Sequence, residues 1–516
     1  MQLIKKIFNS FLILAGIVIM VVLFGFALMM LFHISIFGYT YASAAGAYGE
    51  NFEFIAASIN SIDIETQGVS LEIHYSSDVN YNKVSVIMYE DFQGIVKDDV
   101  KSISFAENPN VQSGVLKVAT TEPSGLIVKN NSKISISLPR NKVLSDLNIK
   151  CGGKEIDFGT DENQLVVNNL NLISTRRSIN PGITLSENLK VQNDLYLETF
   201  AGRIKVNAYI GNDVNIKTNI GTIIFNRSLP ANVTITGEDP NVEFGEVRSS
   251  LVSAIENEKE YDLSALKQVN IGGSLNILDV ERGNIKISGT VGEYVYMKAP
   301  NVQLWANKIS KGITCSNGSN DIKIFGSLGA GNQSGESILN VGSHLFINEA
   351  YGTLKVNADK NGVNIRNAHG DVNVQNNNKE TIVSFANDAV GKTLTVEQKS
   401  GNIVARNILG TAILNAPEGK IEAIFANITG ENKINCRDDA AVKTKDGLVY
   451  ELTTKTKSGS VDVRLGSVAY DNWNDATKDG DWKVVINNIN SADSSTLTDK
   501  LVIAVSGRGK TTVSAY

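Results

Sequence analysis

The chain is poor in the residues on which most catalytic and metal centres depend. Its 516 residues include only four His and three Cys. The cysteines, Cys151, Cys315 and Cys436, are widely separated and odd in number, so their spacing predicts neither a disulfide framework nor a zinc site. We interpret them as small buried apolar residues. So few histidines also disfavour a histidine-based catalytic centre.

An excess of charge of one sign is lacking as well. Lys and Arg number 48 and Asp and Glu 54, which gives a formal net charge of -6. Without a global basic field, nucleic acid is not expected as a partner, and acidic polymers are equally disfavoured as ligands.

Proline is scarce, with 8 residues, whereas Gly contributes 44 and Asn more than 50. This composition favours turns and tight corners over long helices. At 42% hydrophobic and 20% charged residues, the chain is typical of folded proteins and long enough for three or four average domains. Asn side chains can also form stacked hydrogen-bond ladders, although a bias in genome composition explains their abundance equally well.

The N-terminus carries a long apolar run. Lys5 and Lys6 precede the segment Phe11 to Phe32, and no other charged residue occurs before Glu50. As a helix, 22 such residues span about 33 Å, which matches a hydrocarbon layer of about 30 Å. The run therefore predicts a transmembrane helix with the two lysines on the cytoplasmic side and nearly all of the chain outside.

A cleaved signal peptide is the alternative for this segment, because Ala42-Ser43-Ala44 offers a small-residue cleavage site after Ala44. The apolar run is longer than the 7 to 15 residues typical of signal peptides, so we favour an uncleaved anchor. Both interpretations predict an extracytoplasmic location. The anchor in addition predicts a single-pass protein of the cell membrane.

From about residue 145 the chain repeats a short motif: Gly, any residue, an aliphatic residue, any residue, and a second aliphatic residue. Copies begin at Gly202, Gly221, Gly283, Gly352, Gly370, Gly401, Gly419 and Gly459. Their closest spacings give a period of 18 to 20 residues, with a second short strand between successive copies.

Alternation within each strand is strict: Ile204 and Val206 point one way, and Lys205 points the other. Coiling would stack the apolar pairs of successive periods into one interior column. The sequence therefore predicts an all-β fold, a β-solenoid with an N-terminal transmembrane helix. A series of β-sandwiches is the alternative, but it does not account for the period.

Changes in the pattern along the chain predict five segments. They are a cytoplasmic tip and transmembrane helix at 1–37, a linker at 38–55, a β-rich capping region at 56–150, the solenoid repeats at 151–466, and a C-terminal β cap at 467–516. The last segment contains Trp473 and Trp482. Caps are expected because an open end of a solenoid would pair with other strands.

With these repeats, the region from Ile59 to Gly466 resembles the bacterial putative-adhesin family, a domain of unknown function built from Gly-x-Ile-x-Val repeats. The likeness is carried by the segments that begin at Gly202, Gly283, Gly370 and Gly459, and by Ile62–Glu65 followed by Val69–Ile73. The resemblance implies a β-solenoid at the cell envelope without established catalytic residues. The interval from Gly221 to Gly283 departs from the regular spacing of the repeats.

Two motifs suggest ligands but fail on their context. The segment Ala504–Thr511 resembles a phosphate loop, yet the residues after Thr511 favour a strand over the helix such a loop requires, so we interpret it as a basic β-turn. The segment Asp475–Asp481 has the oxygen spacing of a calcium loop, but Ile486 replaces the bidentate Glu. A polar turn is favoured there, with surface calcium as the alternative.

The remaining polar residues form no catalytic pattern. Glu72, Asp371, Glu422 and Asp462 occupy outward strand positions, where solvation is the expected role, and His74, His344 and His369 lack metal-ligand spacing. We therefore assign no catalytic, cofactor-binding or metal-binding residue and expect neither an enzyme nor a cofactor.

These observations favour a membrane-anchored, extracytoplasmic β-solenoid surface protein with a non-catalytic adhesive or structural role. Its expected partners are the membrane, through the N-terminal helix, and glycans or surface proteins, through outward side chains. Two alternatives stay open: a carbohydrate-active β-helix enzyme and a self-associating envelope scaffold. The sequence does not specify the ligand or the oligomeric state.

Overall fold

The protein is predominantly β-strand and divides into two compact units, residues 1–211 and 212–516. The computed structural model describes residues 2–32, 35, 39–78, 80–97, 103–121, 125–152, 156–159, 164–175, 182–247, 253, 267–316, 318, 320–456, 460–465, 468–471, 480–486 and 498–516. The division into five segments expected from the sequence stays a prediction, and each unit is described by itself.

The N-terminal helix α1 (Gln2–Phe32) contains the predicted apolar run. Its segment Phe11–Leu31 has a mean hydropathy of 3.0, and most of its large side chains are exposed. The helix is therefore long and apolar enough to cross a membrane, although a signal sequence has the same properties.

Unit 1 contains a sheet with the strand order β1 (Tyr39–Ile55), β4 (Lys83–Lys97), β8 (Lys133–Leu138), β3 (Ser70–Tyr75) and β10 (Ile156–Phe158), with β7 (Gly125–Asn130) also on β4. Strands β1, β4 and β8 run antiparallel, whereas β3 and β10 continue the sheet in parallel. Tyr39–Ile55 forms a strand where the sequence suggests a linker. Its small residues from Ala42 to Ala47 carry no apolar alternation, so pairing with β4 specifies this strand.

The other strands of unit 1 are mostly parallel. Their order is β5 (Ser104–Gln112), β6 (Val115–Thr121), β2 (Ser61–Thr66), β9 (Leu144–Cys151) and β11 (Leu165–Ser174). The two halves of β11 pair with β13 (Leu189–Val191) and β14 (Leu195–Thr199), and β13 pairs in turn with β16 (Tyr209–Ile210). Two further strands, β12 (Ile183–Leu185) and β15 (Arg203–Val206), pair with each other. The short helix η1 (Ala56–Ser58) precedes β2.

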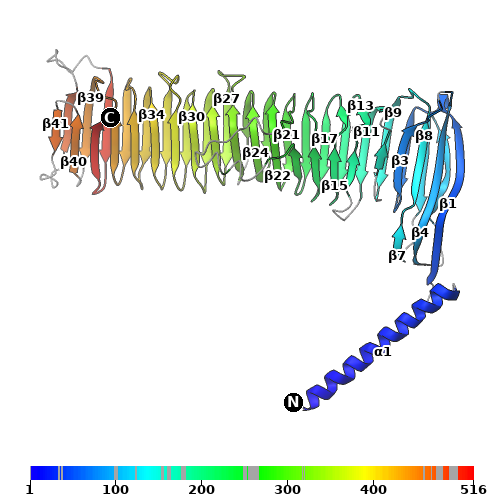
Figure 1. Ribbon diagram of the computed structural model, residues 1–516. Coiled ribbons are helices and arrows are strands. Elements are labelled where there is room, and N and C mark those ends of the chain that lie inside the picture. Colours follow the sequence, from blue (N-terminus) through cyan, green and yellow to red (C-terminus); the bar gives the residue numbers. More distant parts are fainter. Residues whose placement is uncertain are drawn as a thin grey trace. The chain divides into compact units, whose positions relative to one another are not determined.

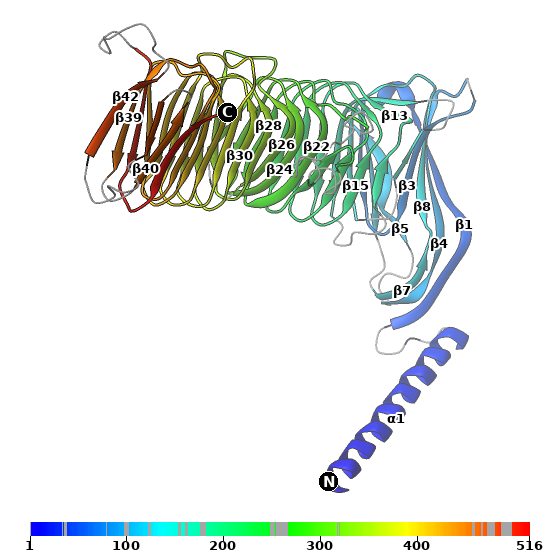
Figure 2. The same ribbon diagram turned by 60° about the vertical axis from the view of Figure 1, so that its left-hand side comes forward.

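Unit 2 consists of two long sheets, and most consecutive strands alternate between them (Figure 1, Figure 2). Sheet I has the order β17 (Val214–Thr218), β19 (Val233–Gly237), β21 (Leu275–Val280), β23 (Tyr294–Lys298), β25 (Gly312–Cys315), β27 (Glu336–Val341), β29 (Thr353–Ala358), β31 (Val372–Asn376), β33 (Thr393–Gln398), β35 (Thr411–Ala416), β37 (Glu431–Cys436), β43 (Lys500–Val505), β39 (Tyr450–Thr456) and β42 (Gly480–Ile486).

Sheet II has the order β18 (Thr222–Phe225), β20 (Asn241–Phe244), β22 (Arg282–Val291), β24 (Asn301–Ile309), β26 (Asp321–Leu328), β28 (Leu345–Ala350), β30 (Val363–Ala368), β32 (Thr381–Phe385), β34 (Ile403–Ile408), β36 (Ile421–Phe425), β38 (Ala440–Thr444), β44 (Lys510–Ala515), β40 (Ser460–Leu465) and β41 (Val468–Asp471). We call two consecutive strands, one in each sheet, a rung.

The strands of neighbouring rungs pair in parallel with their apolar residues in register. In sheet I, Val356, Val374, Val396 and Leu414 are successive Cα partners, and each is fully buried. Burying one such side chain contributes about 1.5–3 kcal/mol, and a rung shares this burial with its neighbours on both sides. These long parallel sheets are consistent with a solenoid-like fold.

The chain does not fill the last rungs in sequence order. Strand β43 lies between β37 and β39 and pairs in parallel with both, while β44 lies between β38 and β40. Figure 1 shows the same order: the orange strands β39 and β40 lie on one side of the red C-terminal strands, and the strands that precede β39 in sequence lie on the other side. Beyond them, β42 and β41 pair antiparallel with β39 and β40.

The repeat glycines allow neighbouring rungs to approach closely. A Cβ atom added to Gly370 would lie 1.9 Å from the backbone oxygen of Gly352, one rung earlier.

We therefore expect Gly370→Ala to lower the unfolding free energy of the full chain by about 1–3 kcal/mol or more. Urea denaturation in detergent measures this loss as a lower midpoint. Gly362→Ala is the matched control, since its Cβ would stay 3.2 Å from the Glu380 oxygen. Equal midpoints for the two variants would contradict this packing.

Candidate functional site

A polar hollow of about 490 Å³ lies on the outer face of β31, β33 and β35. We call it the amide groove. It is lined by Asn373, Gln375, Asn376, Asn377, Thr395, Glu397, Gln398, Lys399, Asn415 and Pro417.

Strand register creates this groove. Gln375, Glu397 and Asn415 are Cα partners on three adjacent strands, although 18 to 22 residues separate them in sequence. The row continues in both directions, through Asn357 and Asn340 on one side and Asn435 on the other.

Side chains of the row bond to each other across strands. Asn357 Nδ2 donates to Asn340 Oδ1 at 2.8 Å, and Asn415 Nδ2 donates to Glu397 Oε2 at 3.2 Å. An outward position repeated once per rung thus becomes a continuous band of amide and carboxylate groups.

Buried hydrogen bonds hold the floor of the groove in place. Asn376, Thr381 and Gln398 are each at most 1% exposed. Asn376 Nδ2 donates to Thr381 Oγ1 at 3.0 Å, and Thr381 Oγ1 donates to Gln398 Oε1 at 2.6 Å. Gln398 Nε2 then donates to the backbone oxygens of Lys379 and Ser400. Because every member is satisfied, this network fixes the edge of β33 that borders the groove.

The groove offers mainly neutral donors and acceptors. Amide side chains can each donate and accept, a pattern that suits ligands rich in hydroxyl or amide groups. Among its described lining residues, Glu397 is the one carboxylate and Lys399 the one cation. Glycosidic cleavage usually uses two carboxyl groups, and the described lining residues supply one of them.

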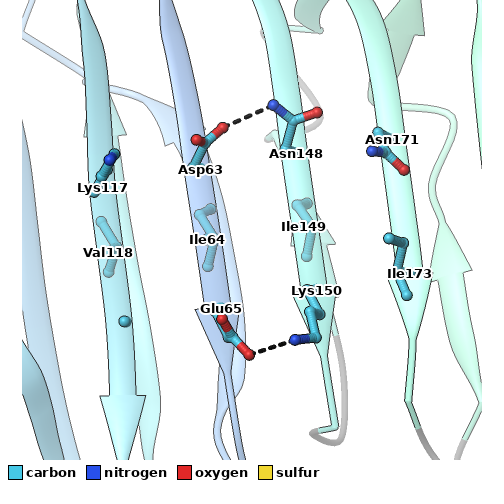
Figure 3. Close-up of a pocket in the computed structure, with 11 residues that line it drawn as sticks. Asp63, Ile64, Glu65, Lys117, Val118, Asn148, Ile149, Lys150, Asn171 and Ile173 are labelled. Atoms are coloured by element: carbon cyan, nitrogen blue, oxygen red, sulfur yellow. Dashed lines mark hydrogen bonds and ion pairs between the residues drawn. The ribbon is translucent and has the colours of Figure 1, made fainter. Parts of the chain in front are cut away.

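A second hollow, of about 270 Å³, lies within unit 1 on β6, β2, β9 and β11 (Figure 3). Its polar groups are engaged across the strands: Asn148 Nδ2 donates to Asp63 Oδ1, and Lys150 Nζ bonds Glu65 Oε1, each at 2.7 Å. Ala119, opposite Glu65, leaves the space open. These contacts are typical of cross-strand stabilisation, so we rank this hollow below the amide groove.

The outward carboxylates lie in separate places and have separate surroundings. Glu72 forms an ion pair with Lys133 at 2.9 Å, Asp371 Oδ1 accepts from the Thr393 N–H at 2.8 Å, and Glu422 is exposed. Asp462 differs from the expectation of a solvated residue, because its side chain is only 5% exposed. The insertion of β44 beside β40 brings Lys510 to this carboxylate.

Two of the histidines have polar partners. His74 Nε2 lies 2.9 Å from Ser137 Oγ, and His369 Nδ1 lies 2.7 Å from Asp388 Oδ1 with its ring stacked on Tyr351. His344 lies just before β28. The sequence did not lead us to pair His369 with Asp388. Their separation of 19 residues, about one rung, is the signal that could have suggested the contact. Within the described residues, no group of three or more His, Cys, Asp and Glu is placed to hold a metal ion.

The other candidate residues have structural positions or lie outside the description. Cys151, Cys315 and Cys436 are buried, and burial raises the pKa of Cys436 to about 12. Residues 506–509 connect β43 to β44 through a bend, and a strand instead of a helix follows. Most of the proposed calcium loop Asp475–Asp481, together with Trp473, lies outside the described residues.

Comparisons with known proteins do not assign this chain to a family. The chain matches no family model and no curated protein. Among solved structures, it is similar to one described as a putative cell adhesion protein from Clostridium sporogenes. The match has 8% identity, covers 91% of this chain and 100% of the other, and has a TM-score of 0.14. At that TM-score the likeness carries no argument.

The environment of Asp462 predicts a pH dependence. Lys510 and then Arg464 hold the pKa of this carboxyl below its ordinary value of 3.8. Because folding lowers the pKa, the carboxylate stabilises the folded chain above about pH 4, and this contribution is lost as the pH falls through the lowered pKa. We expect Asp462→Asn to lower the urea midpoint near neutral pH and to match the wild type in acid.

The exposed Glu422→Gln removes a carboxylate without a buried ion pair and is the control, and its urea midpoint near neutral pH should stay close to that of the wild type. A wild type and an Asp462→Asn variant with equal midpoints at every pH would contradict the role of the carboxylate.

The buried network under the amide groove predicts a second stability effect. Gln398→Met keeps the side-chain length but removes the acceptor of the Thr381 hydroxyl and the amide donor to two backbone oxygens, so we expect a loss of about 1–3 kcal/mol in unfolding free energy. Gln375→Met, on the exposed face, should change stability by less than about 0.5 kcal/mol. Chemical denaturation of the full chain measures both, and similar losses would refute the network's contribution.

Proposed function

We propose that this chain is a β-solenoid surface protein, anchored in the membrane by α1, whose amide groove binds a neutral, hydroxyl-rich ligand of the glycan class without cleaving it. The observation that carries the proposal is the register-aligned row of outward side chains across β27 to β37, five amides and the Glu397 carboxylate. The solenoid assignment is supported by the alternation of strands between two parallel sheets.

An extended polymer fits this surface better than a small molecule. Neighbouring strands lie about 4.8 Å apart, so the same outward position recurs at that interval along the sheet. A chain of sugar units lying across the strands would meet a similar set of donors and acceptors at each step. Individual contacts would be weak, and their repetition would supply the affinity.

The membrane and non-catalytic parts of the proposal rest on other features. Phe11–Leu31 in α1 has the length and hydropathy of a membrane span, and this supports the anchor. The single described carboxylate of the groove supports binding without cleavage, because a carbohydrate-active enzyme would need a second carboxyl group about 5–9.5 Å from the first.

The test is a binding screen of the full chain in lipid nanodiscs against neutral and charged oligosaccharides and envelope polymers, with analysis of released products. We expect retention of a neutral glycan and no cleavage. The double variant Gln375→Ala/Asn415→Ala removes groove amides from two strands, and two lost hydrogen bonds of about 0.5–1.5 kcal/mol each correspond to a Kd that is weaker by roughly 5- to 150-fold.

The matched control is Asn215→Ala/Asn276→Ala, which removes outward amides from β17 and β21 of the same sheet. Its Kd should stay close to that of the wild type. Equal losses in the two double variants would refute the groove as the binding site, and released oligosaccharides would favour the enzyme alternative.

A further inference from the structure

The C-terminal strand pair, β43 and β44, lies between strands that precede it in the sequence. We call the space that it occupies the slot. Strand β43, from Lys500 to Val505, pairs along its length with β37 on one side and with β39 on the other. Strand β44 does the same between β38 and β40. Residues 431–465 therefore provide both walls of the slot, and the C-terminal strand pair occupies it.

The slot is specific for this strand pair. Leu501, Ile503 and Val513 enter the interior and are fully buried, and their Cα partners on both sides are buried positions as well. Because the buried positions match on both sides, a shift by one residue would expose these apolar side chains and bury outward residues instead.

Polar contacts fix the two ends of the inserted pair. Asp499 Oδ1 accepts from the Gly430 N–H at 2.8 Å, and Asp439 Oδ1 accepts from the Lys510 N–H at 2.9 Å. Lys510 Nζ also bonds Asp462 Oδ2 at 2.9 Å, which links the insert to the opposite wall.

The bend between β43 and β44 fits closely against the preceding rung. A Cβ atom on Gly507 would lie 2.4 Å from the Arg437 backbone oxygen, and one on Gly509 would lie 2.0 Å from that of Asp438. The Gly-Arg-Gly-Lys motif that resembles a phosphate loop is thus accounted for by this packing.

We propose that the slot is an acceptor site for a C-terminal strand pair, and that the strand pair of a second copy of this chain enters it and joins the two copies. All the contacts above come from residues 499–513. They are the same whichever copy supplies the pair, so exchange costs few contacts. The walls also precede the insert in sequence, so the slot can form before its own occupant is synthesised.

Reciprocal exchange would close a dimer, whereas one-way exchange would extend a row of copies. This inference concerns the end of sheets I and II. It does not depend on the ligand proposed for the amide groove.

Paired cysteine variants test the exchange. Lys433 on β37 and Val502 on β43 are Cα partners at outward positions, and adjacent strands lie within disulfide range. Chains carrying Lys433→Cys alone and Val502→Cys alone are mixed at full length in detergent, unfolded in urea, refolded together and oxidised. We expect a disulfide-linked dimer of the two different chains on a non-reducing gel.

The control pair is Lys433→Cys mixed with Ile413→Cys. Ile413 is also a Cα partner of Lys433, but it lies on β35, which cannot leave its place without dismantling neighbouring rungs. The first mixture should give several-fold more linked dimer than the control. Equal yields would overturn the exchange.

A single chain carrying both Lys433→Cys and Val502→Cys completes the test. It should form the disulfide within one chain or between chains, which establishes that the strands pair. A single-chain disulfide together with no linked dimer in the mixture would show that each slot takes only its own C-terminus, and absence of any disulfide would overturn the slot itself.

Discussion

Parallel pairing between each strand and the strand one rung later is the interaction on which the structure of unit 2 depends. A strand of five or six residues buries only two or three apolar side chains, too few to stabilise it alone. Stacking places Val374 between Val356 and Val396, so each side chain is covered from both sides. The backbone hydrogen bonds and the apolar rows therefore enforce the same register, and a slip in one would disrupt the other.

The same register governs the outer face. A side chain at one outward position of a strand lies beside its counterparts one rung before and after, and small differences between rungs accumulate into surface features. Where the counterparts are Asn, Gln and Glu, as in the amide groove, they form a band of polar groups in which Asn357 bonds Asn340 and Asn415 bonds Glu397. An amide that bonds one neighbour keeps a further donor and acceptor. Where the counterparts are Lys and Glu, as in the hollow of unit 1, they form a cross-strand ion pair. The function proposed for the groove rests on the remaining amide donors and acceptors.

Insertion of the C-terminal rung shows that stacking need not follow chain order. The pairing rules specify which edges are compatible, and β43 is compatible with both β37 and β39. Burial of Asp462 beside Lys510 is a consequence of this insertion, since the two residues belong to strands that are neighbours only because β44 enters. The proposed exchange between copies extends the same property of the edges.

The sequence by itself determined the local pattern: the apolar helix, the short alternating strands, and the period of about one rung, because each depends on the spacing of neighbouring residues. A predominantly β chain with solenoid-like parallel strands and one apolar N-terminal helix was predictable on that basis. Only the tertiary structure decided that Tyr39–Ile55 is a strand, that Gln375, Glu397 and Asn415 share a groove, and that residues 500–515 return between earlier rungs. Those features depend on which edges pair over long sequence separations, and a repeated pattern makes many edges look alike.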